Sequence, residues 1–138
     1  MPAENRIDRE NHLVRVRLVG RITPEDLEQG FEARAREPGY EPGMDLLLDC
    51  TDATIEFGRT GVQRILRYFA SRRAERGSGF RVALVGNSDL NFGMARMYET
   101  LSGLEAGYPE EARAFRDAEE ARRWLLEPRE VEVGEGGG

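Results

Sequence analysis

The sequence predicts one α/β domain built on a mostly parallel sheet, and three observations lead to this prediction. The chain has 138 residues, which is the usual size of a single domain. Short apolar runs alternate with segments of helical periodicity, in the order β-β-α-β-α-β-α-β-α. The first two runs are too close in sequence to allow a crossover helix between them. We therefore expect a mixed, mostly parallel sheet with an N-terminal antiparallel hairpin and about four helices.

The N-terminal hairpin is predicted from residues 7–19. Apolar and polar residues alternate from His12 to Val19, which is typical of a strand with one exposed face. A shorter run around Ile7 precedes it, and Glu10-Asn11 between the two runs favours a turn.

The first helix is predicted to begin at Thr23-Pro24-Glu25-Asp26. Threonine is a good N-cap, proline fits the first helical position, and an acid three residues after the cap completes a capping box. Apolar residues then recur on one helical face at Leu27, Phe31 and Ala35. Pro-Gly pairs between residues 38 and 43 end the helix, and Met44–Asp49 reads as a buried strand.

The remaining elements follow the same alternation. We expect helices at about residues 60–75 and 91–104, strands at 81–86 and 112–116, and a last helix after the capping box at 117–120. Residues 1–127 are predicted to form the domain. Residues 128–138 are rich in Glu and Gly and are predicted to be a disordered tail.

The composition excludes several kinds of chemistry. All 20 basic residues are arginines, so the chain has no lysine for a phosphate-binding loop, a Schiff base or pyridoxal phosphate. It has one cysteine, Cys50, and one histidine, His12, so a single chain can form neither a disulfide nor a two-histidine metal site. We expect no cofactor, no bound metal and no enzymatic activity.

Charge and hydropathy indicate the compartment and the partners. The net charge of −6 disfavours nucleic acid, because binding phosphates needs a positive surface. The sequence has no apolar N-terminal run typical of a secretion signal and no transmembrane segment. A lone cysteine suits a reducing compartment, so we expect a cytoplasmic protein.

Four segments together resemble the SpoIIAA-like proteins. These are Gly20–Leu27, Arg81–Gly86, Phe92–Tyr98 and Phe115–Leu125, and the resemblance covers about residues 5–126. This family is related to the STAS domains of anti-sigma factor antagonists and, in fold, to the CRAL-TRIO lipid carriers. The resemblance implies a STAS-like fold within the domain predicted for residues 1–127.

The resemblance also singles out Thr60. In the anti-sigma factor antagonists, a phosphorylated serine precedes a glycine at the start of a helix, usually within Asp-Ser-Ser-Gly. The comparable stretch here is Gly58-Arg59-Thr60-Gly61, in which Gly58 and Arg59 depart from the pattern. Two interpretations follow for Thr60: it is the N-cap of its helix, or it is a phosphorylation switch at the helix N-terminus.

Polar side chains cluster after two of the predicted buried strands. In open α/β sheets, ligands bind beyond the carboxyl ends of the strands. The residues there are Asp49, Asp52, Asn87, Ser88 and Asp89. They either bind a cation through oxygen ligands or, as these residue types usually do, form turns and helix caps; we favour the second and expect no metal.

An apolar pocket is predicted beside the helix at 91–104. Phe92 lies opposite the main apolar face of that helix, so both sides must be buried or one must contact a ligand or partner. The candidate pocket residues are Ile55, Phe57, Leu90, Phe92, Met94, Met97 and Tyr98. The alternative is ordinary core packing.

Two further groups have both a structural and a functional interpretation. Five arginines of the helix at 60–75 read as a solvated surface or as a contact with anionic lipid headgroups at a membrane surface: Arg64, Arg67, Arg72, Arg73 and Arg76. Cys50 reads as a small core residue or as a nucleophile assisted by His12.

Two functions from different classes remain. The first is a non-enzymatic, STAS-like regulatory or protein-interaction module that docks a protein partner. The alternative is a carrier or sensor of a small apolar or lipid-like ligand, with a pocket near Phe57 and Phe92. A homodimer is expected for either, because closed two-fold pairs are the commonest oligomers.

Overall fold

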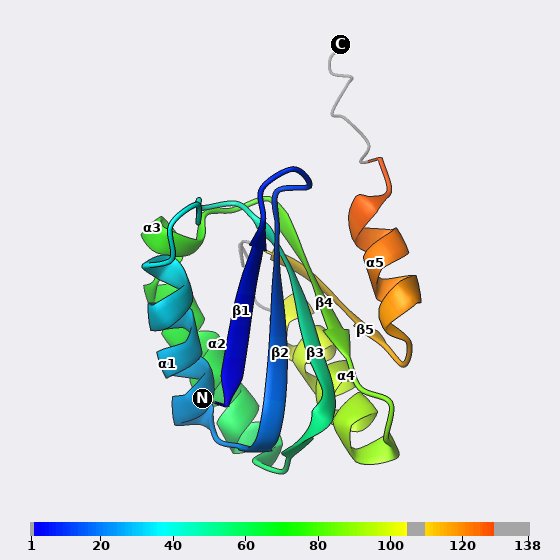
Figure 1. Cartoon of the computed structure of the whole chain (residues 1–138). Coiled ribbons are helices and arrows are strands. Elements are labelled where there is room, and N and C mark those ends of the chain that lie inside the picture. The colour runs from blue at the N-terminus through cyan, green and yellow to red at the C-terminus, as the bar shows by residue number, and fades with distance from the viewer. Residues whose placement is uncertain (1, 105–109, 129–138) are drawn as a thin grey trace.

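The computed structural model describes residues 2–104 and 110–128 of the chain. Within this part the strands form one five-stranded sheet in the spatial order β1-β2-β3-β4-β5 (Figure 1). β1 pairs with β2 in antiparallel fashion, and every other pair is parallel. The strands are β1 (Ala3–Asp8), β2 (Leu13–Ile22), β3 (Asp45–Ile55), β4 (Phe80–Val85) and β5 (Glu110–Phe115). The expected mixed sheet with an N-terminal hairpin is therefore confirmed.

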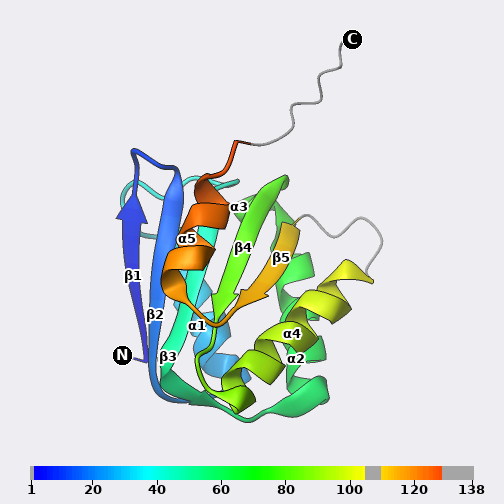
Figure 2. The same ribbon diagram turned by 90° about the vertical axis from the view of Figure 1, so that its right-hand side faces the viewer.

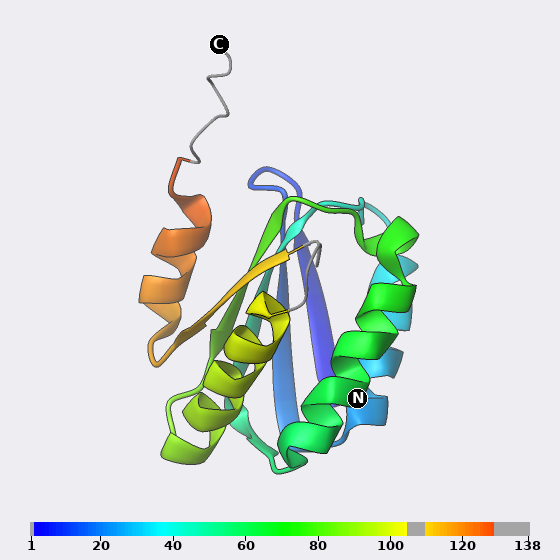
Figure 3. The same ribbon diagram turned by 180° about the vertical axis from the view of Figure 1, so that it is seen from behind.

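The helices are divided unequally between the two faces of the sheet. α1, α2 and α4 lie together on one face (Figure 3), and α5 lies on the opposite face from α4 (Figure 2). The helices are α1 (Pro24–Ala35), α2 (Gly58–Ser71), α3 (Arg73–Arg76), α4 (Asp89–Gly103) and α5 (Ala118–Leu126). The short α3 is one more helix than expected. It arises because the single helix predicted to reach Glu75 is interrupted at Arg72, whose ψ is 32°.

The core follows this division. The larger part lies between the sheet and α1, α2 and α4, where alternate residues of β2 and β3 meet Phe31, Ile65 and Phe69. A smaller cluster lies under α5, where Trp124 packs against the other face of the sheet. The side chains of that cluster are Leu13, Leu47, Ala83, Val85, Ala121, Trp124 and Leu125.

Helix capping matches the sequence prediction at two helices and differs at a third. Thr23 and Asp26 form the predicted capping box of α1, and Asp117 caps α5. The N-cap interpretation of Thr60 is wrong, because α2 begins two residues earlier at Gly58 and is preceded by Phe57, whose side chain makes no cap hydrogen bond. Gly58, the first residue of α2, has φ of 61°, a left-handed conformation that glycine adopts without strain.

The predicted domain of residues 1–127 falls almost entirely within the described part of the chain. The predicted disordered tail lies outside the described residues from position 129 onward. Among the described helices, none combines the length and the apolar character needed to cross a membrane.

Gly86 allows α4 to approach the end of β4, which gives a first prediction. A Cβ atom at residue 86 would lie 2.7 Å from the backbone carbonyl carbon of Asn91. We expect Gly86→Ala to lower the free energy of unfolding by about 1–3 kcal/mol, because backbone must move to accommodate it. Urea unfolding followed by circular dichroism measures this.

The matched control is Gly93→Ala, within α4. A Cβ at residue 93 meets nothing within 4 Å, so this change should stabilise by up to about 1 kcal/mol through helix propensity. Equal effects of the two substitutions would contradict the close approach at Gly86.

Candidate functional site

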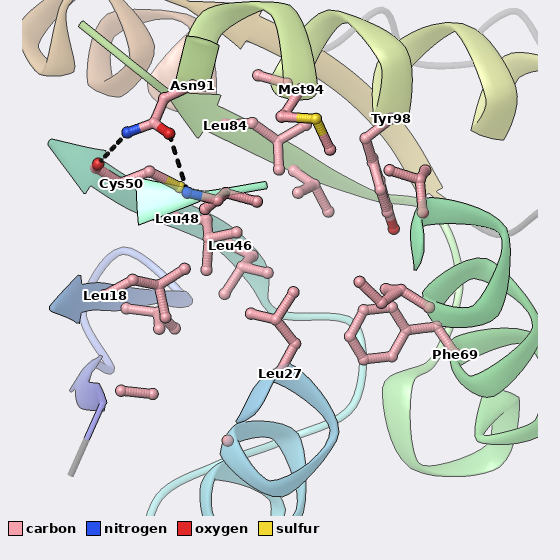
Figure 4. A pocket seen from close by; sticks show the side chains of 18 of the residues that line it. Leu18, Leu27, Leu46, Leu48, Cys50, Phe69, Leu84, Asn91, Met94 and Tyr98 are labelled. Atoms are coloured by element: carbon pink, nitrogen blue, oxygen red, sulfur yellow. Dashed lines mark hydrogen bonds between the residues drawn. The ribbon is translucent and has the colours of Figure 1, made fainter. Parts of the chain in front are cut away.

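An apolar cavity of about 70 Å³ lies between the sheet and helices α1, α2 and α4. In Figure 4, Leu27 of α1, Phe69 of α2, and Met94 and Tyr98 of α4 surround the leucines of the sheet. The sheet side is formed largely by Val16, Leu18, Leu46, Leu48, Val82 and Leu84. The cavity is partly enclosed, and its lining is dominated by carbon. Such a space favours an apolar guest over water.

Asn91 holds the cavity wall at the carboxyl end of β3. Its amide nitrogen donates to the carbonyl oxygen of Cys50 at 2.9 Å, and its amide oxygen accepts from the Ile55 N–H at 3.3 Å (Figure 4). The amide nitrogen also donates to the carbonyl oxygen of Ala53 at 2.8 Å. The side chain is buried and all its bonds go to one strand. The first turn of α4 is therefore fixed to β3, as a buried polar group with satisfied hydrogen bonds requires.

A buried ion pair holds the wall at the other end, where β4 and β5 begin. The Glu110 carboxylate of β5 accepts from the Arg76 guanidinium of α3 at 2.5 Å and from the Tyr98 hydroxyl of α4 at 2.7 Å. The Arg76 and Glu110 side chains are 3% and 0% exposed. The Arg76 guanidinium also lies 4.2 Å from the centre of the Phe69 ring. One carboxylate thus joins three elements.

Arg34 is a second buried cation beside this pair. The residue is 6% exposed, lies on α1 and lines the cavity together with Arg76. Its guanidinium carbon lies 5.0 Å from the centre of the Phe31 ring. Burial lowers the pKa of Arg34 from 12.5 to about 10, opposed by Tyr40 and Glu110 and reinforced by the positive charge of Arg76. Among the described residues, no carboxylate lies within ion-pair distance of Arg34.

Arginines of α2 and of the residue after it bridge to α1. Arg64 donates to Glu28 at 3.0 Å and to Glu25 at 3.2 Å, and Arg72 pairs with Glu32. The solvated-surface interpretation is therefore wrong for Arg76, which is buried opposite Glu110. The Arg64 and Arg72 side chains are 43% and 25% exposed and pair with acidic residues of α1 at the surface. These bridges hold α1 and α2 together as one wall.

Four of the seven predicted pocket residues line the cavity, namely Ile55, Phe57, Met94 and Tyr98. Leu90, Phe92 and Met97 are not part of the lining. Leu90 is 49% exposed, and Met97 packs against the core elsewhere. The guanidinium of Arg116 lies 4.3 Å from the centre of the Phe92 ring, so that the second apolar side of α4 contacts a cation of the chain.

The predicted polar cluster at the strand ends is divided among separate contacts. Asp52 pairs with Arg17 at 2.7 Å, and Asp89 pairs with Arg116 at 3.1 Å. The remaining contacts are local: Asp49 accepts from the Thr51 N–H, and Ser88 is the N-cap of α4. Asn87 is exposed. In the described part of the chain, no three histidine, cysteine or acidic side chains form a group that could hold a metal ion.

Cys50 and His12 lie at different ends of the sheet. Cys50 faces the cavity toward the end of β3, and burial raises the pKa of its thiol to about 12, so the nucleophilic thiolate is scarce at neutral pH. His12 lies in the turn before β2, where its Nε2 is 3.2 Å from Glu41 Oε1. Thr60 is exposed in the first turn of α2.

A second hollow of about 280 Å³ lies over β1, β2 and β3. Its lining is more polar and includes Arg6, Arg15 and Arg17. Arg17 already pairs with Glu4 and Asp52, and all three side chains are at least half exposed. Exposed ion pairs of this kind contribute little free energy because water screens the charges. The partly enclosed apolar cavity is therefore the stronger candidate site.

The charged end of the cavity was not predicted from the sequence. Arg34 follows Leu27, Gly30 and Phe31 at helical spacing, which places it on the buried face of α1. That spacing was a usable signal for Arg34. Nothing in the sequence places Glu110 beside Arg76, because their pairing depends on how α3 and β5 meet in the fold.

Comparison with known proteins supports the fold. No family model and no curated protein matches the sequence. Among solved structures, the chain is similar to an uncharacterised protein of the DUF3478 family with a SpoIIAA-like fold from Shewanella loihica PV-4. The two are 21% identical, with a TM-score of 0.55 over 89% of this chain and 91% of the other. The SpoIIAA-like fold expected from the sequence is therefore confirmed. At this identity the likeness shows the fold alone.

The two buried arginines should respond oppositely to removal of their charge. Arg76→Met leaves the Glu110 carboxylate buried with one cation fewer, and we expect a loss of about 3–5 kcal/mol. Arg34→Met removes a cation whose pKa is depressed by burial. We expect it to be neutral or to stabilise by up to about 2 kcal/mol.

The lowered pKa of Arg34 sets the pH range in which its charge destabilises the folded chain. Because the pKa of Arg34 is about 10 in the folded chain and 12.5 ordinarily, the unfolded chain binds more protons between these values. The free-energy cost of keeping Arg34 charged in the folded chain is therefore full below pH 10. This cost decreases as the pH rises from 10 toward 12.5. Urea unfolding at neutral pH measures both variants, and an equally large loss in Arg34→Met would contradict this assignment.

Proposed function

We propose that the chain is a non-enzymatic regulatory domain that binds a small, mainly apolar molecule in the cavity between the sheet and helices α1, α2 and α4. The observation that carries this proposal is the cavity itself, with its carbon-rich lining drawn from three helices and the sheet. Well-packed interiors contain few voids larger than a water molecule, so a cavity of about 70 Å³ needs a reason.

The size of the cavity narrows the ligand class. An engineered cavity of about 150 Å³ binds benzene, and the present volume of about 70 Å³ is roughly half of that. A guest of a few carbon atoms fits without movement of the helices. A long acyl chain does not fit, so the proposal favours a sensor of a small molecule over a lipid carrier.

The position of the cavity suits a regulatory role. Its walls belong to two groups of elements. In the first, the Arg64 ion pair joins α1 to α2. In the second, Asn91 fixes α4 to β3. A guest that contacts both Phe69 and Met94 would change the free energy of moving α1 and α2 relative to α4 and β3. The surface of α2 would then present a different arrangement to a partner.

Xenon binding tests whether the cavity accepts an apolar guest. Dissolved xenon should shift the methyl resonances of Leu48, Leu84 and Met94 in a saturable way, because apolar cavities take up xenon. Ala95 lines the cavity, and Ala95→Leu should abolish these shifts by filling the space. Two-dimensional methyl NMR spectra measure the effect.

Ala70→Leu is the matched control, since Ala70 lies on the exposed side of α2. It should leave the xenon response unchanged, and thermal unfolding should show both variants folded. Absence of saturable shifts in the unsubstituted chain would sink the proposed function.

A second candidate is docking of a protein partner under the control of phosphorylation at Thr60. Its support is the first turn of α2, which has no side-chain cap and no acidic residue, with Thr60 exposed there. A phosphate on Thr60 would meet free N–H groups and the positive end of the helix dipole.

Thr60→Glu tests whether this turn responds to negative charge. We expect it to raise the free energy of unfolding by about 0.3–1 kcal/mol over Thr60→Gln, which has the same shape without the charge. The difference should shrink in high salt because of screening. Equal stability of the two variants in low salt would remove the electrostatic basis for a switch.

The compartment and the oligomer remain predictions from the sequence. We keep the proposals of a cytoplasmic protein and a homodimer. Native mass spectrometry of the purified chain would distinguish a monomer from a dimer. It would also reveal a covalent phosphate, which survives denaturation.

A further inference from the structure

The two buried arginines at the cavity differ in how their charge is balanced. Both oxygens of Glu110 are engaged, one by Arg76 and the other by Tyr98. Arg34 lines the same cavity but makes no ion pair with any described residue; its guanidinium lies 5.0 Å from the centre of the Phe31 ring and beside the uncharged Tyr40 side chain. Arg34 is therefore a buried cation without a carboxylate of its own.

Asp45 is another acidic side chain at this end of the fold, and it is also engaged. Asp45 is 7% exposed and lines a small adjoining hollow together with Arg34 and Tyr40. Its Oδ1 accepts from the Arg81 N–H of β4 at 2.9 Å. This bond fixes the Asp45 carboxylate between two strands, beyond ion-pair distance of Arg34.

An unbalanced buried cation is costly to the folded state. Methionine or leucine at residue 34 would complete the apolar face that Leu27, Gly30 and Phe31 begin, at no such cost. A guanidinium has five donors in a planar fork that matches a carboxylate in two parallel hydrogen bonds. Arg34 is one of the residues that line the apolar cavity, and a guanidinium beside apolar side chains suits an anion with a short hydrocarbon chain.

We propose that the cavity ligand is a short-chain carboxylate whose carboxyl group pairs with Arg34 and whose hydrocarbon chain lies among Leu46, Leu48 and Met94. This inference rests on the proposed function and names the ligand class of the same site. The ligand carboxylate supplies the negative charge that balances the Arg34 guanidinium, and the cavity lining supplies the apolar contacts. The cavity has room for roughly three carbon atoms, which is the length of the hydrocarbon chain of butyrate, so butyrate is a suitable probe.

Butyrate and 1-butanol form a matched pair of probes. They have the same number of carbon atoms, but only butyrate carries a charge at pH 7. Titration followed by methyl NMR should show butyrate binding at least tenfold more tightly than 1-butanol. Arg34→Met should weaken butyrate binding at least tenfold and leave 1-butanol binding within about twofold.

Two further variants make the test specific. Arg34→Gln retains a polar side chain without the charge and should lose the preference for butyrate as Arg34→Met does. Arg67→Met removes an exposed arginine of α2 and should leave both affinities unchanged. Loss of butyrate binding in Arg67→Met as well would indicate attraction by surface charge and overturn the assignment to Arg34.

The outcomes separate this inference from the proposed function. Equal affinities for butyrate and 1-butanol, or an undiminished preference in Arg34→Met, would overturn the inference and leave apolar binding in place. Xenon uptake without butyrate binding would do the same. Failure of xenon, butyrate and 1-butanol alike would contradict the proposed function itself.

Discussion

The Glu110 carboxylate is the point on which the arrangement of the helices depends. It accepts from Arg76 of α3 and from Tyr98 of α4, and it lies at the start of the edge strand β5. A carboxylate in such a place must have its charge matched and its oxygens hydrogen-bonded, so the two helical elements are held at a fixed distance from each other. The aromatic rings around Arg76 exclude water from the pair. The wall of the cavity at the amino ends of the strands follows from this one interaction.

The opposite wall depends on an uncharged group. Asn91 uses its whole amide on the backbone of β3, so α4 is fixed at both ends while the residues between them are apolar. The cavity lies between these two contacts of α4. The apolar middle of the cavity thus has a polar anchor on either side. That combination, with Arg34 beside it, is the basis for proposing a small amphipathic ligand and a regulatory role.

The sequence was a better guide to the fold than to the site. Alternation in β2 and the capping box at Thr23 are local signals, and both were read correctly. The site was sought at the carboxyl ends of the strands, following the general behaviour of open α/β sheets. The buried charges lie instead at the amino ends. Arginines are rarely buried, so Arg76 was assigned to the surface, and its partner Glu110 is brought to it only by the fold. Four pocket residues were found because apolar spacing on α4 and the segment before α2 is a local signal too.

The central claim is that the buried Arg34 guanidinium pairs with the carboxylate of a ligand in the apolar cavity. A crystal structure of the full chain grown with butyrate tests it most directly. The account predicts one butyrate in the cavity, with its carboxylate within hydrogen-bond distance of the Arg34 guanidinium and the Arg76–Glu110 pair unchanged. A cavity closed by side chains, or an Arg34 guanidinium paired with a carboxylate of the chain itself, would contradict it.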